Sequence, residues 1–238
     1  MNKNNLSLIA FALLVAHATH GGVIVGLSLP EVVKAVVTKN QEQIVTVVDE
    51  FNAQNGTNYQ FQVEQYSPHK SLSFVSVDQL SVDQAEAKFP GITATLEDVA
   101  AKHTALDLAT SFKTLNTQVW ENKTAWAYKF QDGKTRTNYH NVVLVAGEDD
   151  KLKALVKDVR DGLASFNIKD HNAFAGHLTL GKIYLADNAP VSQDAVDALV
   201  KYQAVVTALN NDTITINSFK LMGHDKSEKV FNLAQSKQ

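Results

Sequence analysis

The sequence has no cysteine, and this absence removes several kinds of chemistry at once. Disulfide frameworks, cysteine-based zinc sites and thiol catalysis all need a cysteine sulfur. The sequence also lacks a P-loop, a dinucleotide-binding glycine fingerprint, a Gly-x-Ser-x-Gly motif and a zinc-binding helix motif. Any catalytic chemistry must therefore come from other side chains.

An excess of positive charge is missing as well. Lys and Arg total 22, Asp and Glu total 25, and the formal net charge is −3 at pH 7. Proteins that track along nucleic acid make many Lys and Arg contacts with phosphates, so we do not expect this chain to bind long nucleic acid. A small nucleotide or the end of an RNA strand needs only one or two local donors and remains a candidate partner.

Long apolar runs are scarce, and the clearest one lies at the start of the chain. The polar segment "MNKNN" precedes "LSLIAFALLVA", and "AHA" at 16–18 has the small-x-small form of a cleavage site. This is the plan of a secretory signal peptide, and the apolar run is short for a membrane span. We predict that residues 1–18 are a signal peptide cleaved near Ala18 and that the mature chain, without a membrane span, is periplasmic or secreted. A buried N-terminal strand or an uncleaved anchor is the alternative.

The remainder, residues 19–238, has the composition of a globular protein, with 45% hydrophobic and 20% charged residues. Its approximate halves, 19–135 and 136–238, share one order: strand, helix, strand with a histidine, helix, strand pair. We predict an α+β fold of two similar, interleaved lobes around a central cleft. Each lobe is a small, mostly antiparallel sheet with helices on its outer face. No linker rich in Pro, Gly or Ser separates the halves, so we expect one packed unit and a monomer.

The spacing of apolar residues, together with capping residues and the positions of Gly and Pro, predicts the main helices and strands. The predicted elements are a strand at 23–29, a helix at 31–54, a strand at 71–77, a helix from Thr95 with Leu106 and Phe112 on its apolar face, two strands around a turn at Asn122-Lys123, a strand at 141–147, a helix capped by Asp149-Asp150, a strand at 176–185, a helix at 192–209 and a closing hairpin.

Two short motifs on predicted strands have the form His-x-Ser/Thr, namely His69-Lys70-Ser71 and His177-Leu178-Thr179. Residues two apart in a strand share a face, so each motif places an imidazole beside a hydroxyl, while Leu178 and Leu180 point into the core. An imidazole exchanges a proton near neutral pH, and a hydroxyl donates to an anionic oxygen. Two such pairs across a cleft suit in-line attack on a phosphodiester.

The bare pattern is weak, because about one match is expected by chance and a single strand histidine is more often structural. Its occurrence on corresponding strands of two similar halves favours catalysis. The other histidines have no metal-ligand spacing, so we interpret them as surface or structural residues and predict no metal and no cofactor. They are His103, His140, His171 and His224.

With these motifs in place, the sequence resembles the two-histidine (2H) phosphoesterase superfamily, whose members include RNA 2',3'-cyclic phosphodiesterases. The segments that carry the resemblance are "HKSLSF", "HLTL", the opening "GVIVGLSLP" and the ending "SFKLMGHDK". The resemblance implies that His177 is the base for water and His69 the acid for the leaving group. It also implies that Ser71 and Thr179 bind the phosphate.

Two positions depart from the superfamily pattern. Lys70 stands where an apolar residue is usual, so we expect its side chain to reach solvent or the strand to be partly exposed. Lys182 is a basic residue after the second motif and a candidate for substrate binding, but its odd offset from His177 predicts that it faces away. Tyr66 is a further candidate.

The aromatic residues Trp120, Trp126 and Tyr128 are predicted to lie in the core or on a sheet face, and one of them could stack on a base. Arg136 and Tyr139 are additional candidates for substrate contacts. We therefore predict a metal-independent hydrolase for 2',3'-cyclic phosphates or related small RNA-type phosphodiesters. The alternative is an exported, non-catalytic module that binds a nucleotide or a phosphorylated ligand.

Overall fold

The computed structural model describes residues 22–64, 69–76, 78–108, 112, 115–168, 176–204 and 214–235. The predicted signal peptide, Tyr66 and His171 lie outside these residues. Among the helices that the structure describes, none combines the length and apolar character needed to cross a membrane.

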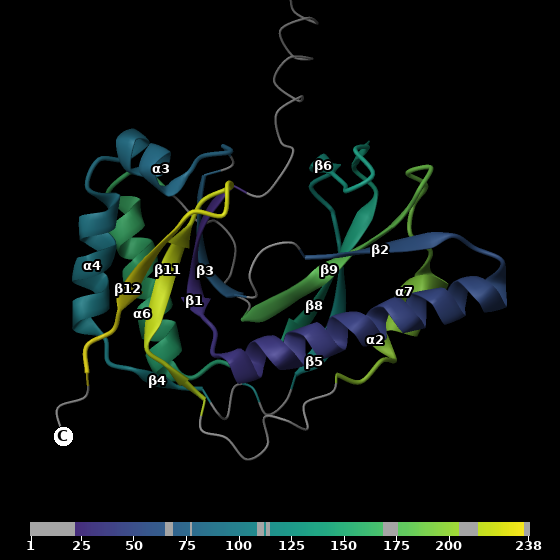
Figure 1. The fold of residues 1–238 in the computed structure, drawn as a ribbon, viewed down its shortest axis with the longest axis horizontal. Coiled ribbons are helices and arrows are strands. Elements are labelled where there is room, and N and C mark those ends of the chain that lie inside the picture. Colours follow the sequence, from purple (N-terminus) through teal and green to yellow (C-terminus); the bar gives the residue numbers. More distant parts are fainter. Residues whose placement is uncertain are drawn as a thin grey trace, which may run out of the picture.

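One antiparallel sheet forms the centre of the molecule, with strand order β12-β11-β1-β3-β9-β8-β5 (Figure 1). Strand β2 also pairs with β9, on the same edge as β3 and opposite β8. The strands are β1 (Val23–Ser28), β2 (Tyr59–Val63), β3 (His69–Ser76), β5 (Asn116–Glu121), β8 (Tyr139–Val145), β9 (His177–Leu185), β11 (Ser218–Met222) and β12 (Glu228–Asn232). Short two-stranded pairs lie outside it: β4 (Leu106–Asp107) with β10 (Thr215–Ile216), and β6 (Tyr128–Lys129) with β7 (Thr135–Arg136).

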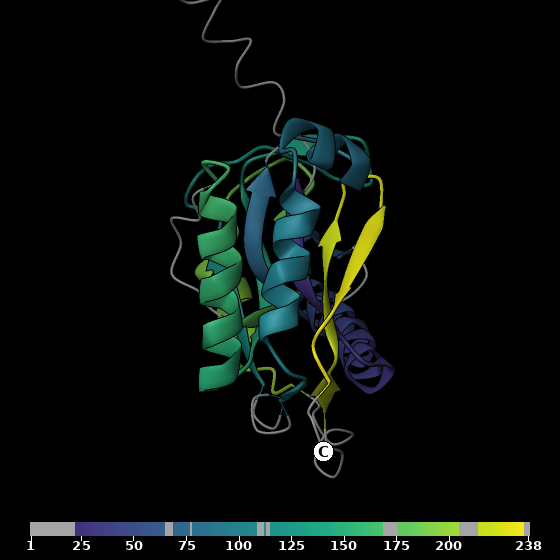
Figure 2. The ribbon, with the colours of Figure 1, turned by 90° about the vertical axis from the view of Figure 1, so that its left-hand side faces the viewer.

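The helices cover this sheet in two groups. They are α2 (Glu31–Asn55), α3 (Val82–Lys88), α4 (Ile92–Lys102), α6 (Asp150–Ala164) and α7 (Gln193–Val200). Helices α4 and α6 stand side by side against β3 and β12, whereas α2 and α7 pack against β2, β9 and β5 (Figures 1 and 2). The predicted α+β class and antiparallel pairing are confirmed. The two-lobed arrangement stays a prediction, because the strands form one continuous sheet.

Local chemistry explains where most helices begin and end. Helix α2 buries Val33, Val37 and Ile44 along one stripe and ends at Gly56, whose φ of 65° suits a residue without a Cβ. Helix α6 begins after Asp149, whose carboxylate accepts a hydrogen bond from the Leu152 N–H at 2.7 Å. Both features match the sequence-based predictions.

The structure corrects both ends of one predicted helix, the end of another and the pairing of two strands. Helix α4 begins at Ile92 rather than at Thr95, and it ends at Lys102, where the backbone becomes extended at His103. Leu106 lies in β4 and Phe112 lies further along the chain, and both are buried, so neither belongs to the apolar face of α4. The strands on either side of Asn122 pair with β8 and β7 instead of each other, and α7 ends at Val200.

Candidate active site

The two histidine motifs lie on neighbouring strands. Strands β3 and β9 meet in one residue pair, Lys70 with Leu178, which are the middle residues of the two motifs. In an antiparallel pair, one step forward on one strand is one step back on the other. At the next positions, Ser71 therefore comes beside His177 on one side of this pair, and the backbone of His69 comes beside Thr179 on the other.

Strand β8 shows which residues of β9 share a face. It pairs regularly with β5, so its alternate residues Val145 and Val143 lie on one face, and their partners on β9 are His177 and Thr179. Both side chains are half-buried. Leu178 and Leu180 are completely buried on the opposite face, as predicted. We call the face that carries His177 and Thr179 the His177 face.

A β-bulge corrects the prediction for Lys182. The register between β8 and β9 shifts at Val142/Val143, where Leu180 is an extra residue on β9. Lys182 consequently pairs with Asn141, which is two residues from Val143 on the regular strand β8. Lys182 therefore lies on the His177 face. The sequence analysis placed it on the other face because it assumed strict alternation.

Trp120 lies against the second histidine. Its partner on β8 is Asn141, so it also belongs to the His177 face. The indole ring meets the His177 imidazole edge-on, with 4.6 Å between ring centroids, and its Nε1–H donates to Gln118 Oε1 at 2.8 Å. Trp120 is only half-buried. Sequence reasoning named it as one of several aromatic candidates, and the structure places it directly at the histidine.

The first motif is described less completely, because the side chain of His69 lies outside the described part of the chain. Its backbone pairs with Ser28 of β1, and Ser71 pairs with Gly26. Gly26 and Ser28 alternate with Val25 and Leu27, which are fully buried. Ser71 thus lies on the face opposite the buried row, and it is half-buried.

Lys70 contradicts the expectation of an exposed side chain. It pairs with Leu27 on one side and with Leu178 on the other, in a row of core residues, and its exposed fraction is 0%. Its Nζ donates to the carbonyl oxygen of Gly147 at 3.3 Å. Burial lowers the pKa of Lys70 to about 8, although the nearby carboxylates of Glu148 and Asp149 oppose this effect.

A second charged cluster surrounds Lys182. Its Nζ lies 3.2 Å from Glu64 Oε2 and 4.3 Å from the centre of the Tyr128 ring. Both members of the ion pair are nearly buried. Burial, together with the charge of Glu64, raises the pKa of Tyr128 to about 12, so the phenol stays neutral at physiological pH. This cluster places a cation on the same face as His177.

The other candidate residues make contacts that stabilise the fold and do not lie at the two histidine motifs. Arg136 is buried, pairs with Asp132 at 2.6 Å and lies over the rings of Phe130 and Tyr184. Tyr139 is buried in the same aromatic cluster. His103 Nε2 lies 2.9 Å from Asp158 Oδ2 and links the end of α4 to α6. Within the described ranges, no group of His, Asp and Glu has the arrangement of a metal site.

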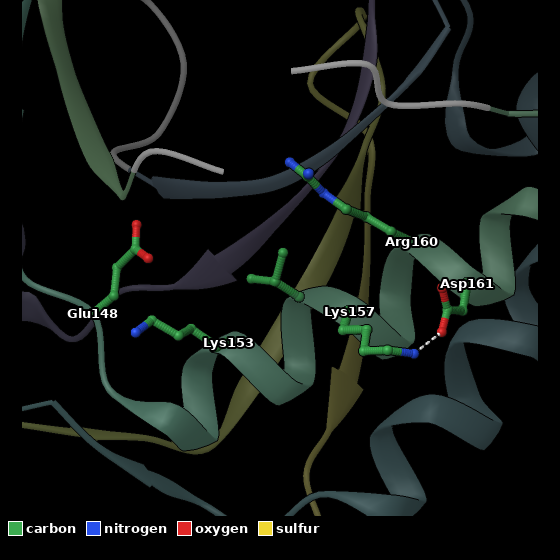
Figure 3. A pocket seen from close by; sticks show the side chains of 6 residues that line it. Glu148, Lys153, Lys157, Arg160 and Asp161 are labelled. Carbon is green, nitrogen blue, oxygen red and sulfur yellow. Dashed lines mark hydrogen bonds and ion pairs between the residues drawn. The ribbon is translucent and has the colours of Figure 1, made fainter. Parts of the chain in front are cut away.

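A shallow hollow lies on α6, away from the His177 face. It is lined by Glu148, Lys153, Val156, Lys157, Arg160 and Asp161. Figure 3 shows Lys157 turned toward Asp161, while Glu148 and Lys153 stand at the opposite end. Arg160 donates from Nε to the Leu72 carbonyl at 3.3 Å. The mixed charges here give no clear preference for a ligand.

Comparisons with known proteins agree with this architecture. The sequence matches no protein-family model and no curated protein. The structure matches Usb1 of Kluyveromyces marxianus with a TM-score of 0.50 and 11% identity, over 91% of this chain and 99% of that one. It also matches E. coli LigT in complex with 3'-AMP, with a TM-score of 0.42 and 12% identity, over 90% and 96%. The match to Usb1 shows a shared fold, and the α+β class with an antiparallel sheet that the resemblance implied is confirmed.

Proposed function

We propose that this chain is a metal-independent phosphodiesterase that hydrolyses 2',3'-cyclic phosphates or related small RNA-type phosphodiesters. The observation that carries the proposal is the meeting of the two motifs at the Lys70–Leu178 pair. This pair brings together two imidazole–hydroxyl motifs that are far apart in the sequence. The 2H phosphoesterase fold supports the same assignment at the level of reaction class.

In the proposed reaction, the two histidines transfer protons on opposite sides of the phosphorus. His177 takes a proton from a water molecule while the water oxygen forms a bond to phosphorus. The phosphorus–oxygen bond to the ribose breaks in line, and His69 gives its proton to the departing oxygen. After the reaction His177 carries one extra proton and His69 lacks one, so the site is restored when His177 releases a proton and His69 takes one up from solvent.

The hydroxyls of Ser71 and Thr179 would donate hydrogen bonds to the non-bridging phosphate oxygens. Because charge on these oxygens changes during the reaction, fixed donors in a partly dry site stabilise the transition state. Both side chains are half-buried and on strands, which supports fixed positions. Proton transfer and charge stabilisation are then both supplied by side chains of this chain.

The His177 face offers two groups for the rest of the substrate. Trp120 provides a half-buried aromatic surface beside His177, and we assign it to stacking on a base. Lys182, held by Glu64, adds a positive charge on the same face for the phosphate or ribose oxygens. Tyr66, just before the first motif, remains a candidate on the basis of sequence.

The proposal is tested by incubating the full chain with the four 2',3'-cyclic nucleotides in EDTA and following product formation. We expect turnover in EDTA, and a loss of roughly 10²-fold or more in kcat for His177→Ala and for His69→Ala. His224→Ala is the matched control, because His224 lies at the β11–β12 turn and should leave kcat unchanged.

Absence of turnover on these nucleotides and on a panel of short oligonucleotide diesters would overturn the enzyme assignment. Tight nucleotide binding without turnover would then support the non-catalytic binding module. Full activity in both histidine variants would show that the reaction uses other residues.

A further inference from the structure

The buried charge of Lys70 lies at the junction between the two histidine strands. Lys70 is the residue of β3 that pairs with β9, and its side chain has no exposed surface. Burying an ammonium group is costly unless it is paired. A lysine in a row between Leu27 and Leu178 therefore calls for an explanation other than packing.

The surroundings of the ammonium group connect it to the second motif. Glu148 Oε1 accepts a hydrogen bond from the N–H of Gly176 at 2.7 Å, and Gly176 immediately precedes His177. A Cβ at Gly176 would lie 2.5 Å from Lys70 Nζ and 3.2 Å from Glu148 Cγ. The lysine and the carboxylate thus both lie against the backbone before His177.

The other groups around Lys70 come from two segments. The carboxylates that act on the ammonium in the described part of the chain are those of Glu148 and Asp149, both between β8 and α6. The Gly147 carbonyl accepts its hydrogen bond, and the ring of Phe112 lies 5.8 Å from Nζ. Figure 3 shows Glu148 at the end of the α6 hollow, next to Lys153.

We propose that charged Lys70 is a positioning residue that fixes the His177 strand against the His69 strand through Glu148 and Gly176. Its effect on the reaction rests on the proposed function. Because the ammonium attracts Glu148, and Glu148 holds the Gly176 N–H, loss of the charge loosens the start of β9. His177 is the next residue and moves with it.

This arrangement makes the site sensitive to alkaline pH. The pKa of Lys70 is lowered to about 8 by burial, so the ammonium loses its proton well below the usual range of lysine. With that proton, the attraction between Nζ and the carboxylates of Glu148 and Asp149 is lost. The environment of His177 should therefore change in a step near pH 8, separate from the titration of the imidazole itself.

The test follows the His177 Cε1–H signal by NMR from pH 5 to pH 10 in the wild-type chain and in Lys70→Met. We expect an additional alkaline step near pH 8 in the wild type and its absence in Lys70→Met. Lys220→Met is the matched control, because Lys220 is also a buried lysine paired with a glutamate but lies on β11. It should retain the step.

Kinetics provide the second readout. Lys70→Met should lower kcat roughly ten- to hundredfold with KM within about twofold, as expected for misplacement of a reacting group. Lys70→Arg should recover part of the lost kcat. It should also shift the alkaline step in the pH dependence of kcat to higher pH. A purely structural role would instead lower the amount of folded protein and leave the shape of the pH profile unchanged.

A second variant covers the case in which Lys70→Met does not fold. Glu148→Gln keeps an oxygen for the Gly176 N–H but removes the charge that raises the pKa of Lys70, so the alkaline step should move to lower pH. An unmoved step in Glu148→Gln, or a step that persists in Lys70→Met, overturns the positioning role whether or not the chain is an enzyme. A wild type that shows the step but no turnover overturns the proposed function alone.

Discussion

At the scale of single residues, Lys70 and Lys182 show how far a sequence pattern can be followed. The sequence was enough to single out both lysines. It was also enough to predict that His177 and Thr179 share one face of their strand. The burial of Lys70 was not visible, because an ammonium in an apolar row depends on Glu148 and Gly147, which are distant in sequence. The orientation of Lys182 was predicted wrongly because strict alternation was assumed, although Gly181 inside the strand is the kind of residue that often marks a bulge.

Lys70 makes the stability of the protein depend on pH in a defined direction. Its pKa is about 8 in the folded chain and 10.5 in the unfolded chain, so the unfolded state binds more protons between these values. The free energy of unfolding should therefore rise with pH across this window, by roughly 3 kcal/mol at about 1.4 kcal/mol per pH unit. Below about pH 8 the lysine is charged in both states and contributes no slope.

Urea unfolding at several pH values from 7 to 10.5 measures this slope. Lys70→Met should lack it, whereas Lys220→Met should keep it. Identical slopes in the wild type and in Lys70→Met would show that Lys70 titrates normally in the folded state.

Trp120 is expected to affect substrate binding more than the chemical step. Removing a base-stacking surface costs about 1–3 kcal/mol, so Trp120→Ala should raise KM roughly five- to hundredfold on cyclic nucleotides. Trp120→Phe should retain most of the affinity. Trp126→Ala is the matched control, since Trp126 is 52% exposed and lies near Phe74 rather than His177. Steady-state kinetics of the three variants decide this, and an unchanged KM in Trp120→Ala would rule out stacking.

At the scale of elements, strands and helices with strong local signals were predicted well. Strand β1, helix α2 with its Gly56 end, and helix α6 with its Asp149 cap all lie where capping and alternation placed them. The errors fall where buried residues beyond the end of α4 were assigned to its apolar face, as for Leu106 and Phe112. The partner of β5 could not be inferred, because pairing with β8 depends on a long-range contact.

Gly181 is the position on β9 where a side chain should be least tolerated. A Cβ there would lie 2.3 Å from the backbone oxygen of Gln62 and 2.6 Å from Phe61 Cζ, so β2 would have to move away. Gly181→Ala should lower the unfolding free energy by about 2 kcal/mol or more, as overpacking does. Chemical denaturation measures this loss.

Gly162→Ala on α6 is the matched control for that variant. Its Cβ would meet two side-chain methyls, Thr95 Cγ2 at 3.0 Å and Val99 Cγ2 at 3.6 Å, and alanine favours a helix interior over glycine. We expect a change within about 1 kcal/mol. Equal losses in the two variants would contradict the close approach of β2 to β9.

At the scale of the whole molecule, an α+β fold with an antiparallel sheet could be predicted from the order of elements and the two motifs. The strand order of the one continuous sheet could not, because the pairing of β3 with β9 and of β1 with β11 depends on contacts between residues distant in sequence. The mildly acidic charge fits a small diester substrate better than a long polyanion.

Export is the prediction that belongs to the whole chain. If residues 1–18 are a signal peptide, protein recovered from outside the cytoplasm should begin at Thr19 and be lighter by that segment. N-terminal sequencing and intact mass determine this. An intact Met1 in that fraction would contradict cleavage.

The packing of helices from one half of the chain on strands from the other half affects how the chain folds during synthesis. Helix α2 from the first half covers β9 from the second, and α6 from the second half covers β3 from the first. On the ribosome, the strand with His69 therefore stays without its cover until residues up to Ala164 have emerged. A fragment ending between β7 and β8 should remain unfolded until the complementary fragment is added. Such high contact order predicts slow folding for a chain of this size.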